Sequence, residues 1–514
     1  MIRLIAKKDF LLNLLSVRFI IGFVLCLVII PFTVTVSVDD YLARVRIYEI
    51  EQKKADDGMK KARVWSAVRP VIVTRPEPLS IFSAGITNNA GNSVKIAFDA
   101  CPLFPSGHIS TRDNPLLNAF FSIDFSKVIA ILISLIALVF AYDSITRERE
   151  DGTMKLSLTG QVSRISFLSG KLAGLLLTLL PILLFCYLLA CLIIVVNPGI
   201  ALSAADWGGI ALLFFSSAIY MLVFILLGMF ISGIVKSSSS SIIVSLLCWI
   251  WFLFLTPNIS TYLSQSIVKT PLYDNVQSVM HDYDKAFEED YFAVWRRIRN
   301  EMGIKNLNFY NNRDGEDGLR EITGGTRTAP LFLLRLYPEI IPLTLSNADK
   351  KWALQRNYLG ELEKQQRLQQ RIALLSPSEL FRQITEAICS TGAGNFLKYM
   401  EQIRYYREGV IRYFTDNKLF ASSLYFTPQP LEEYPAEEEI ASLANEEERQ
   451  ARIAKNSWMY PCLDTSNVPV YRQQQPFSLP GALDGAFTRL AALFGLVVLL
   501  LAAMIASFMK YDVR

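Results

Sequence analysis

Long apolar runs alternate with polar segments along this chain, and the lengths of the runs predict its overall class. A helix needs about 20 apolar residues to cross the roughly 30 Å hydrocarbon core of a membrane. The runs that meet or approach this length predict membrane-spanning helices at 19–38, 126–142, 172–196, 207–235, 241–257 and 486–509. The chain is therefore predicted to be an α-helical integral membrane protein with six spans.

Two long polar segments, 39–125 and 258–485, separate these runs. The first begins with a charged helical stretch and continues with "VRPVIVTRPEPLSIF", whose Val, Ile and Pro content predicts short strands. The second is rich in helical patterns, including "SPSELFRQITEAICSTG" and the acidic "EEYPAEEEIASLANEEERQARIAKN". We expect a small mixed α/β unit in the first segment and a mainly helical domain in the second.

The distribution of Lys and Arg predicts the orientation, because short cytoplasmic connections carry an excess of these residues. Segments 1–18, 143–171 and 510–514 carry Lys and Arg residues, and Lys236 lies between the fourth and fifth spans, whereas the connection "NPGIALSAAD" has no basic residue. Both termini are therefore predicted to be cytoplasmic and both long segments extracytoplasmic. Residues 1–18 are expected to form an interfacial helix. The alternative, a cleaved signal peptide, would leave an odd number of spans.

Overall composition excludes several classes of protein. Hydrophobic residues make up 52% of the 514, and the formal net charge is only +4, with no basic run that contains interleaved aromatic residues. These features do not predict nucleic-acid binding. Of the seven cysteines, Cys101, Cys389 and Cys462 lie outside the apolar runs, and a disulfide between Cys389 and Cys462 is possible in an oxidising compartment.

Enzymatic chemistry is not predicted. The sequence has no G-x-x-x-x-G-K-[ST] phosphate-binding loop and no G-x-S-x-G nucleophile elbow. His108 and His281 lack the partners of a zinc motif. The Asp-x-Asp at 282–284 is a common feature of acidic helices. We therefore expect no catalytic residues, no metal site and no bound cofactor.

The segment at 143–171 combines several helix signals with a high density of charge. It contains "TREREDGTMKLSLTGQVSRISFLSGK", in which Gly152 breaks the first helix, Thr153 can cap a short second helix, and Ser163 can cap the following span. "LSLTGQ" lacks the adjacent glycines that would let a backbone approach a phosphate. A short, charged, rigid loop of this kind is a plausible docking element for a partner protein.

This loop resembles the cytoplasmic loop of ABC-2 type transporter permeases, in which an acidic pair, Gly-Thr, a leucine-rich stretch, Ser-Arg and Gly-Lys lead into the third span. The family often has a proline where this chain has Gln161. The outer segments resemble the DUF3526-type subgroup with large extracytoplasmic domains. The resemblance implies a type V exporter-like fold and assigns contact with the ATPase subunit to Arg147, Glu148, Arg149, Glu150, Gly152, Thr153, Leu156, Leu158, Ser163, Arg164 and Lys171.

The same resemblance implies a permease subunit in a bacterial cytoplasmic (inner) membrane. It implies pairing with a second permease subunit, identical or paralogous, and with separate ABC ATPase subunits that bind ATP and Mg²⁺. Arg149 and Arg164 could instead be simple cytoplasmic anchors of the spans. A second hypothesis is an extracytoplasmic scaffold or binding protein held by six helices, and a third is a complex that transmits force without solute transport.

Overall fold

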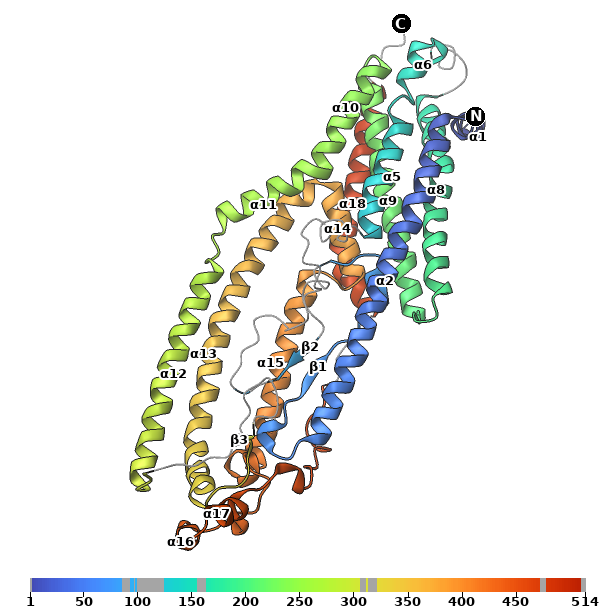
Figure 1. The fold of residues 1–514 in the computed structure, drawn as a ribbon. Coiled ribbons are helices and arrows are strands. Elements are labelled where there is room, and N and C mark those ends of the chain that lie inside the picture. The colour runs from blue at the N-terminus through green and yellow to red at the C-terminus, as the bar shows by residue number, and fades with distance from the viewer. Residues whose placement is uncertain are drawn as a thin grey trace.

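The computed structural model describes residues 2–85, 93–96, 98, 124–154, 163–305, 311–312, 321–471 and 478–509. The molecule is elongated and has two parts, a helix bundle and an arm that extends from one end of it (Figure 1). Within the described residues, six helices are long and apolar enough to cross a membrane. The predicted helical membrane architecture is therefore confirmed.

The bundle consists of the six candidate spans. Its helices are the first part of α2 (Val17–Lys61), α5 (Phe125–Ala141) followed by the short α6 (Thr146–Glu150), α8 (Arg164–Val196), α9 (Ala204–Ile234), α10 (Ser238–Ile250) and α18 (Leu479–Met509). Helix α1 (Ile2–Leu14) precedes α2 and is separated from it by a break at Ser16. We call the end of the bundle that carries α1 and α6 the loop end, and the opposite end the arm end.

Polar side chains define where the spans begin. In each case the side chain of the residue before the helix accepts a hydrogen bond from the backbone N–H three residues later, which satisfies one of the four unpaired donors of a helix start. These capping residues are Ser16, Asp124, Ser163, Ser203 and Ser237. The cap at Ser163 was expected from the sequence, and the structure confirms it.

Helix α9 lies at the centre of the bundle and contacts α5, α8 and α18. A Cβ atom at Gly228 would lie 2.6 Å from the Cβ atom of Ala141, so α9 and α5 approach more closely than larger residues allow. Small residues commonly permit such contacts between membrane helices, where packing replaces the hydrophobic driving force. The buried Tyr187 and Ser217 hydroxyls lie 2.7 Å apart and join α8 to α9.

The fifth span extends past the apolar run that predicted it. After α10 the chain forms a π-helical turn, η3 (Trp251–Leu255), and continues as α11 (Thr256–Ile267). Pro257 has no N–H with which to bond the carbonyl of Phe252, five residues earlier. That carbonyl instead accepts hydrogen bonds from Ser376 Oγ at 2.7 Å and Ser378 Oγ at 2.6 Å.

The arm is built around long helices. The second part of α2 enters it, and it also contains α12 (Tyr273–Glu301), α13 (Thr328–Ile372) and α15 (Ala393–Asp416), with α12 packed along α13 (Figure 1). Buried aromatic and aliphatic residues such as Phe332, Phe414 and Phe426 form the core at its far end. Helix α13 includes Pro338 and Pro342 in its first half.

Strands are few in the described part of the arm. Strand β1 (Val71–Val73) pairs antiparallel with β2 (Ser93–Lys95), with Ile72 opposite Val94, and β3 (Asn311–Asn312) pairs with β4 (Glu321–Ile322). The predicted acidic helix is divided into α16 (Glu437–Ser442) and α17 (Glu446–Ile453) by a new N-cap at Asn445. The remaining elements are short 3₁₀ turns, η1 (Trp65–Ala67), η2 (Pro78–Ile81), η4 (Ala373–Leu375), η5 (Leu419–Ala421), η6 (Ser423–Tyr425), η7 (Leu431–Glu433) and η8 (Ser457–Met459).

The possible disulfide between Cys389 and Cys462 is absent. Cys389 is buried at the end of a helix next to the bundle, Cys462 is exposed, and both are free thiols. Complete burial raises the pKa of the Cys389 thiol well above its usual value, because an apolar surrounding disfavours the thiolate. Cys101 lies outside the described residues.

Helix α14 (Pro377–Ile388) is inserted among the spans at the arm end. It contacts α5, α9 and α18, and the ring of Phe381 stacks on that of Tyr220 with centroids 4.6 Å apart. Its charged residues satisfy one another, because Arg382 forms ion pairs with both Glu379 and Glu386. This helix was expected in the outer domain, but its apolar face forms part of the bundle core.

We predict that Phe381→Ala lowers the stability of the bundle by about 3–5 kcal/mol, because the truncation leaves a cavity in a fully packed site. The matched control is Phe487→Ala on α18, whose side chain is 67% exposed. Thermal unfolding of the purified protein in one detergent measures both. Equal melting temperatures for the two variants would contradict the buried position of α14.

Candidate functional site

The charged segment 143–171 lies at the loop end, where it joins α5 to α8. The structure describes its beginning, residues 143–154, and its end, residues 163–171. Leu156 and Leu158, two of the predicted contact residues, lie outside the described residues. The other predicted residues can each be placed, and most of them bind other helices of the same chain.

A buried cluster of charges joins α1, α6 and α8. The ammonium group of Lys171 in α8 lies 2.6 Å from Glu148 Oε1 in α6 and 3.1 Å from Asp9 Oδ2 in α1. Lys171 is only 5% exposed. Lys8, which is mostly exposed, approaches Glu148 at 3.6 Å and supplies a second positive charge. The cluster therefore holds two carboxylates and two ammonium groups, which limits the cost of burying them.

Two glycines next to Lys171 allow α1 to approach α8. A Cβ atom at Gly170 would lie 2.8 Å from the Cβ of Ile5, and one at Gly174 would lie 2.8 Å from the Cβ of Asp9. Both distances are too short for a real Cβ atom. The two glycines lie four residues apart on α8 and form the surface against which α1 packs. A helix is thus present within the predicted range 1–18, as α1, and it is held against the start of α8; its place at the membrane interface stays a prediction.

Burial also affects the carboxyl group of Asp9. Desolvation raises its pKa above the ordinary value, and the neighbouring Lys171 opposes this shift. A carboxylate in such a position depends on its ammonium partner to remain charged. Asp9 was not among the predicted site residues, because on the sequence it is a single acid beside two lysines.

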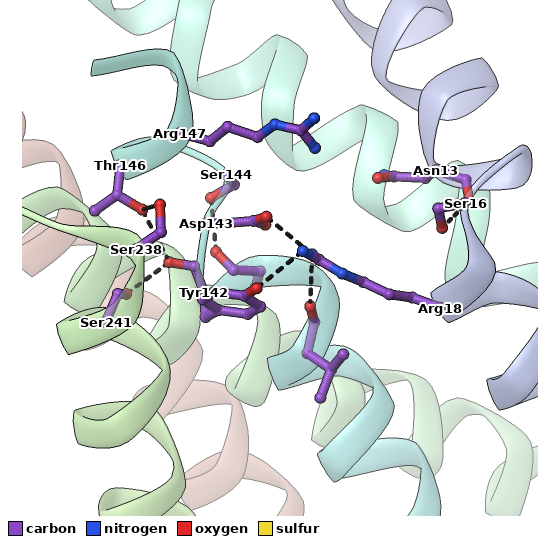
Figure 2. Close-up of polar contacts among 12 residues, drawn as sticks. Asn13, Ser16, Arg18, Tyr142, Asp143, Ser144, Thr146, Arg147, Ser238 and Ser241 are labelled. Carbon is purple, nitrogen blue, oxygen red and sulfur yellow. Dashed lines mark hydrogen bonds and ion pairs between the residues drawn. The ribbon is translucent and has the colours of Figure 1, made fainter. Parts of the chain in front are cut away.

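A second ion pair joins α2 to the end of α5. Arg18 Nη1 lies 2.9 Å from Asp143 Oδ2, and Arg18 Nη2 donates to the Tyr142 hydroxyl at 2.9 Å (Figure 2). The guanidinium carbon also lies 5.0 Å from the centre of the Tyr142 ring. From the sequence Arg18 was assigned only to orientation, and the structure adds this contact with the start of the charged segment.

Glu150 binds the beginning of α10. Its carboxylate accepts hydrogen bonds from the backbone N–H of Ser238 at 2.8 Å and from the Ser238 hydroxyl at 2.6 Å. A carboxylate at a helix N-terminus is favoured by the unpaired N–H groups and the helix dipole. Nearby, the hydroxyl oxygens of Ser238 and Thr146 lie 3.2 Å apart, and Ser241 Oγ donates to the Tyr142 carbonyl (Figure 2). These contacts fix α6 against α10.

Two arginines bind the carbonyl ends of other spans. Arg149 donates to the carbonyls of Gly233 at 3.0 Å and Val235 at 2.9 Å, where α9 ends. Arg164 donates to the carbonyl of Met509 at 2.5 Å, where α18 ends. Cations are favoured at helix C-termini because the last carbonyls are unpaired. Both arginines therefore have a structural role within the chain.

Among the remaining predicted residues that the structure describes, Arg147, Gly152 and Ser163 are exposed and Thr153 is half-buried. Arg147 and Asp151 are 70% and 61% exposed and are separated by 4.0 Å, a geometry that contributes little to stability. The backbone of Gly152 adopts φ = +70°, which favours glycine, and Thr153 Oγ1 donates to the Glu148 carbonyl at 3.3 Å. Arg147 and Glu150 are the exposed residues among the predicted charged contacts that the structure describes, and Glu150 is bound to Ser238, so Arg147 is the better candidate for contact with a partner.

We predict that Lys171→Met destabilises the protein by about 3–5 kcal/mol, because it leaves Asp9 and Glu148 buried without a partner. Lys8→Met, which removes an exposed charge from the same cluster, should cost at most about 1 kcal/mol. Melting temperatures in detergent measure both changes. Adding Asp9→Asn and Glu148→Gln to Lys171→Met should restore most of the loss, and failure of this rescue would contradict the charge-pairing explanation.

Comparison with known families is consistent with this architecture. Residues 3–513 match the family model described as ABC-2 family transporter protein. No curated protein matches the chain at a significant level. The family match spans almost the whole sequence, including all six spans, the charged segment and the arm. The chain therefore belongs to the ABC-2 family of transporter proteins.

Proposed function

We propose that this chain is the membrane-spanning permease subunit of an ABC exporter and that it is driven by separate ATPase subunits docked at the loop end. The observation that carries the proposal is the set of contacts made by α6. Through Glu148, Arg149 and Glu150, this five-residue helix binds α8, α9 and α10. A force applied to α6 therefore reaches several spans at once.

The orientation follows from the positive-inside rule. The loop end carries the basic segments, so we place it and both termini in the cytoplasm of a bacterial cell, with the arm outside the cytoplasmic membrane. The resemblance of the outer segments supports placement in the DUF3526-type subgroup. In this arrangement ATP and Mg²⁺ bind to the partner ATPase, and the permease chain itself contributes no hydrolytic chemistry.

Movement of the ATPase subunits would shift the bundle between two arrangements of packed helices. The buried charges favour movement of α1, α6 and the start of α8 as one unit, because separating Lys171 from its carboxylates is costly. A partner can shift such an equilibrium only if it binds one arrangement more strongly than the other. We propose a second permease subunit, identical or paralogous, as the other half of the transport path.

The partner surface is best assigned to Arg147 and Asp151 together with the predicted contacts Leu156 and Leu158. Glu148 and Glu150 stay within the proposed coupling site, but they act through the chain's own helices. Reversing their charges would disturb α8 and α10, so a loss of coupling in such variants would not identify a docking contact. The exposed pair offers a cleaner test.

We predict that the charge swap Arg147→Glu with Asp151→Arg weakens co-purification of the ATPase subunit by about tenfold, equivalent to about 1.4 kcal/mol. Each residue would then face a partner charge of its own sign, while the internal pair is preserved. The matched control is Glu361→Lys with Lys364→Glu, an exposed pair on α13 of the arm. That control should retain the ATPase.

The co-purification experiment also tests the competing hypotheses. If the wild-type chain brings down no ATPase from its native membrane, the scaffold hypothesis is favoured, since a scaffold needs none. The long arm is the feature that supports that alternative. If the ATPase is retained equally by both swaps, docking at Arg147 and Asp151 is wrong. If ATP hydrolysis by the complex moves no solute, the complex transmits force only.

A further inference from the structure

A polar cavity of about 430 Å³ lies where the arm joins the bundle. Its walls come from the end of α14, the beginning of α15, the beginning of α18 and the segment 74–80. It lies at the end of the bundle opposite the charged segment described above, and the proposed coupling to an ATPase does not involve it. The cavity is therefore a separate candidate for ligand binding.

One wall of the cavity is the start of α15, a helix of 24 residues. Its N-cap is Gly392, which offers no side chain to the unpaired N–H groups of the first turn. Such a helix start attracts anions through its N–H groups and its dipole. Gly394 in the first turn also lines the cavity and leaves the backbone accessible.

A buried hydroxyl group supports the same conclusion independently. Thr391, which immediately precedes the N-cap residue and lines the cavity, is 1% exposed, and its Oγ1 has no hydrogen-bond partner among the described residues. Buried polar groups are normally hydrogen-bonded, and an exception calls for an explanation such as a missing ligand. A ligand oxygen at the start of α15 would supply that partner.

The charges around the cavity also favour an anion. Lys398, in the second turn of α15, and Arg75 line the cavity, are exposed and form no ion pair with any described residue. Arg489 of α18 lines it from the other side and is positioned by Gln383 Oε1 at 3.1 Å. Three acids also line the cavity, Glu77, Glu386 and Asp484, and Glu386 is already paired with Arg382. With Arg44, the lining cations number four and still outnumber the acids.

The cavity is next to the apolar outer surface of a span. On α18, Leu483 and Phe487 are 40% and 67% exposed and alternate with the lining residues Asp484 and Arg489. A molecule with its polar group in the cavity could therefore lay a hydrocarbon chain along α18. A soluble anion would gain no binding free energy from this apolar surface, whereas an amphiphile would gain it by burying its hydrocarbon chain there.

We propose that this cavity binds the anionic headgroup of a membrane amphiphile, with its apolar chain along α18. Binding is a property of this chain alone. That the amphiphile is also the transported substrate rests on the proposed function. Under that function, the substrate class is an anionic membrane amphiphile. Lys398, Arg75 and the first turn of α15 hold the negative charge, and Thr391 donates a hydrogen bond to it.

The test uses the full chain purified in a neutral detergent and a fluorescent phosphatidylglycerol as the probe. We expect phosphatidylglycerol to bind saturably. A diacylglycerol with the same chains and label should bind at least about tenfold more weakly, because it lacks the charge. Arg75→Glu with Lys398→Glu should weaken phosphatidylglycerol binding about tenfold or more, and Thr391→Val a few-fold. The matched control is Arg356→Glu with Arg412→Glu, two exposed arginines on α13 and α15 outside the cavity.

Three outcomes would overturn the proposal. Equal binding of the charged and uncharged probes would exclude headgroup recognition. Equal affinity of the cavity and control variants, both with wild-type melting temperatures, would place the lipid elsewhere. Full displacement of the probe by millimolar inorganic phosphate would indicate a site for free phosphate. Since no ATPase is present, these results do not depend on the co-purification experiment.

Discussion

A charged group at the end of a membrane bundle must keep a partner of opposite charge, and the loop end of this protein depends on that constraint. Lys171 is buried between α1, α6 and α8, and it stays charged at tolerable cost only while Asp9 and Glu148 lie within hydrogen-bonding distance. The constraint fixes α1 against the bundle. It also explains why glycines at 170 and 174 are needed, since any larger residue would separate the partners.

The same principle recurs around α6 with backbone groups as partners. Arg149 and Arg164 bind the carbonyl ends of α9 and α18, and Glu150 binds the N–H end of α10. Each helix end would otherwise present unpaired groups near the membrane. The charges of the segment thus satisfy the ends of the spans around it, and a short helix becomes the common point of attachment for the bundle.

The six spans could be predicted from the sequence because a bilayer imposes a minimum apolar length on any helix that crosses it. The insertion of α14 could not. Its Glu379, Arg382 and Glu386 indicate a surface helix until their mutual ion pairs are seen. For the candidate site, the charged segment could be identified from the sequence. Which of its side chains bind the chain's own helices and which face outward could not. Adjacent residues such as Glu148 and Arg147 have similar sequence properties, and only packing decides which of them is buried.

The length of α2 has a mechanical consequence. Its 45 residues form one helix of roughly 68 Å, more than twice the hydrocarbon thickness of a membrane, and it passes from the loop end into the arm. If the helix behaves as a rod, a tilt of about 5° displaces its far end by roughly 6 Å relative to its start. Rearrangements too small to open a wide path between the spans could therefore still move the outer part of the molecule by more than one helical turn.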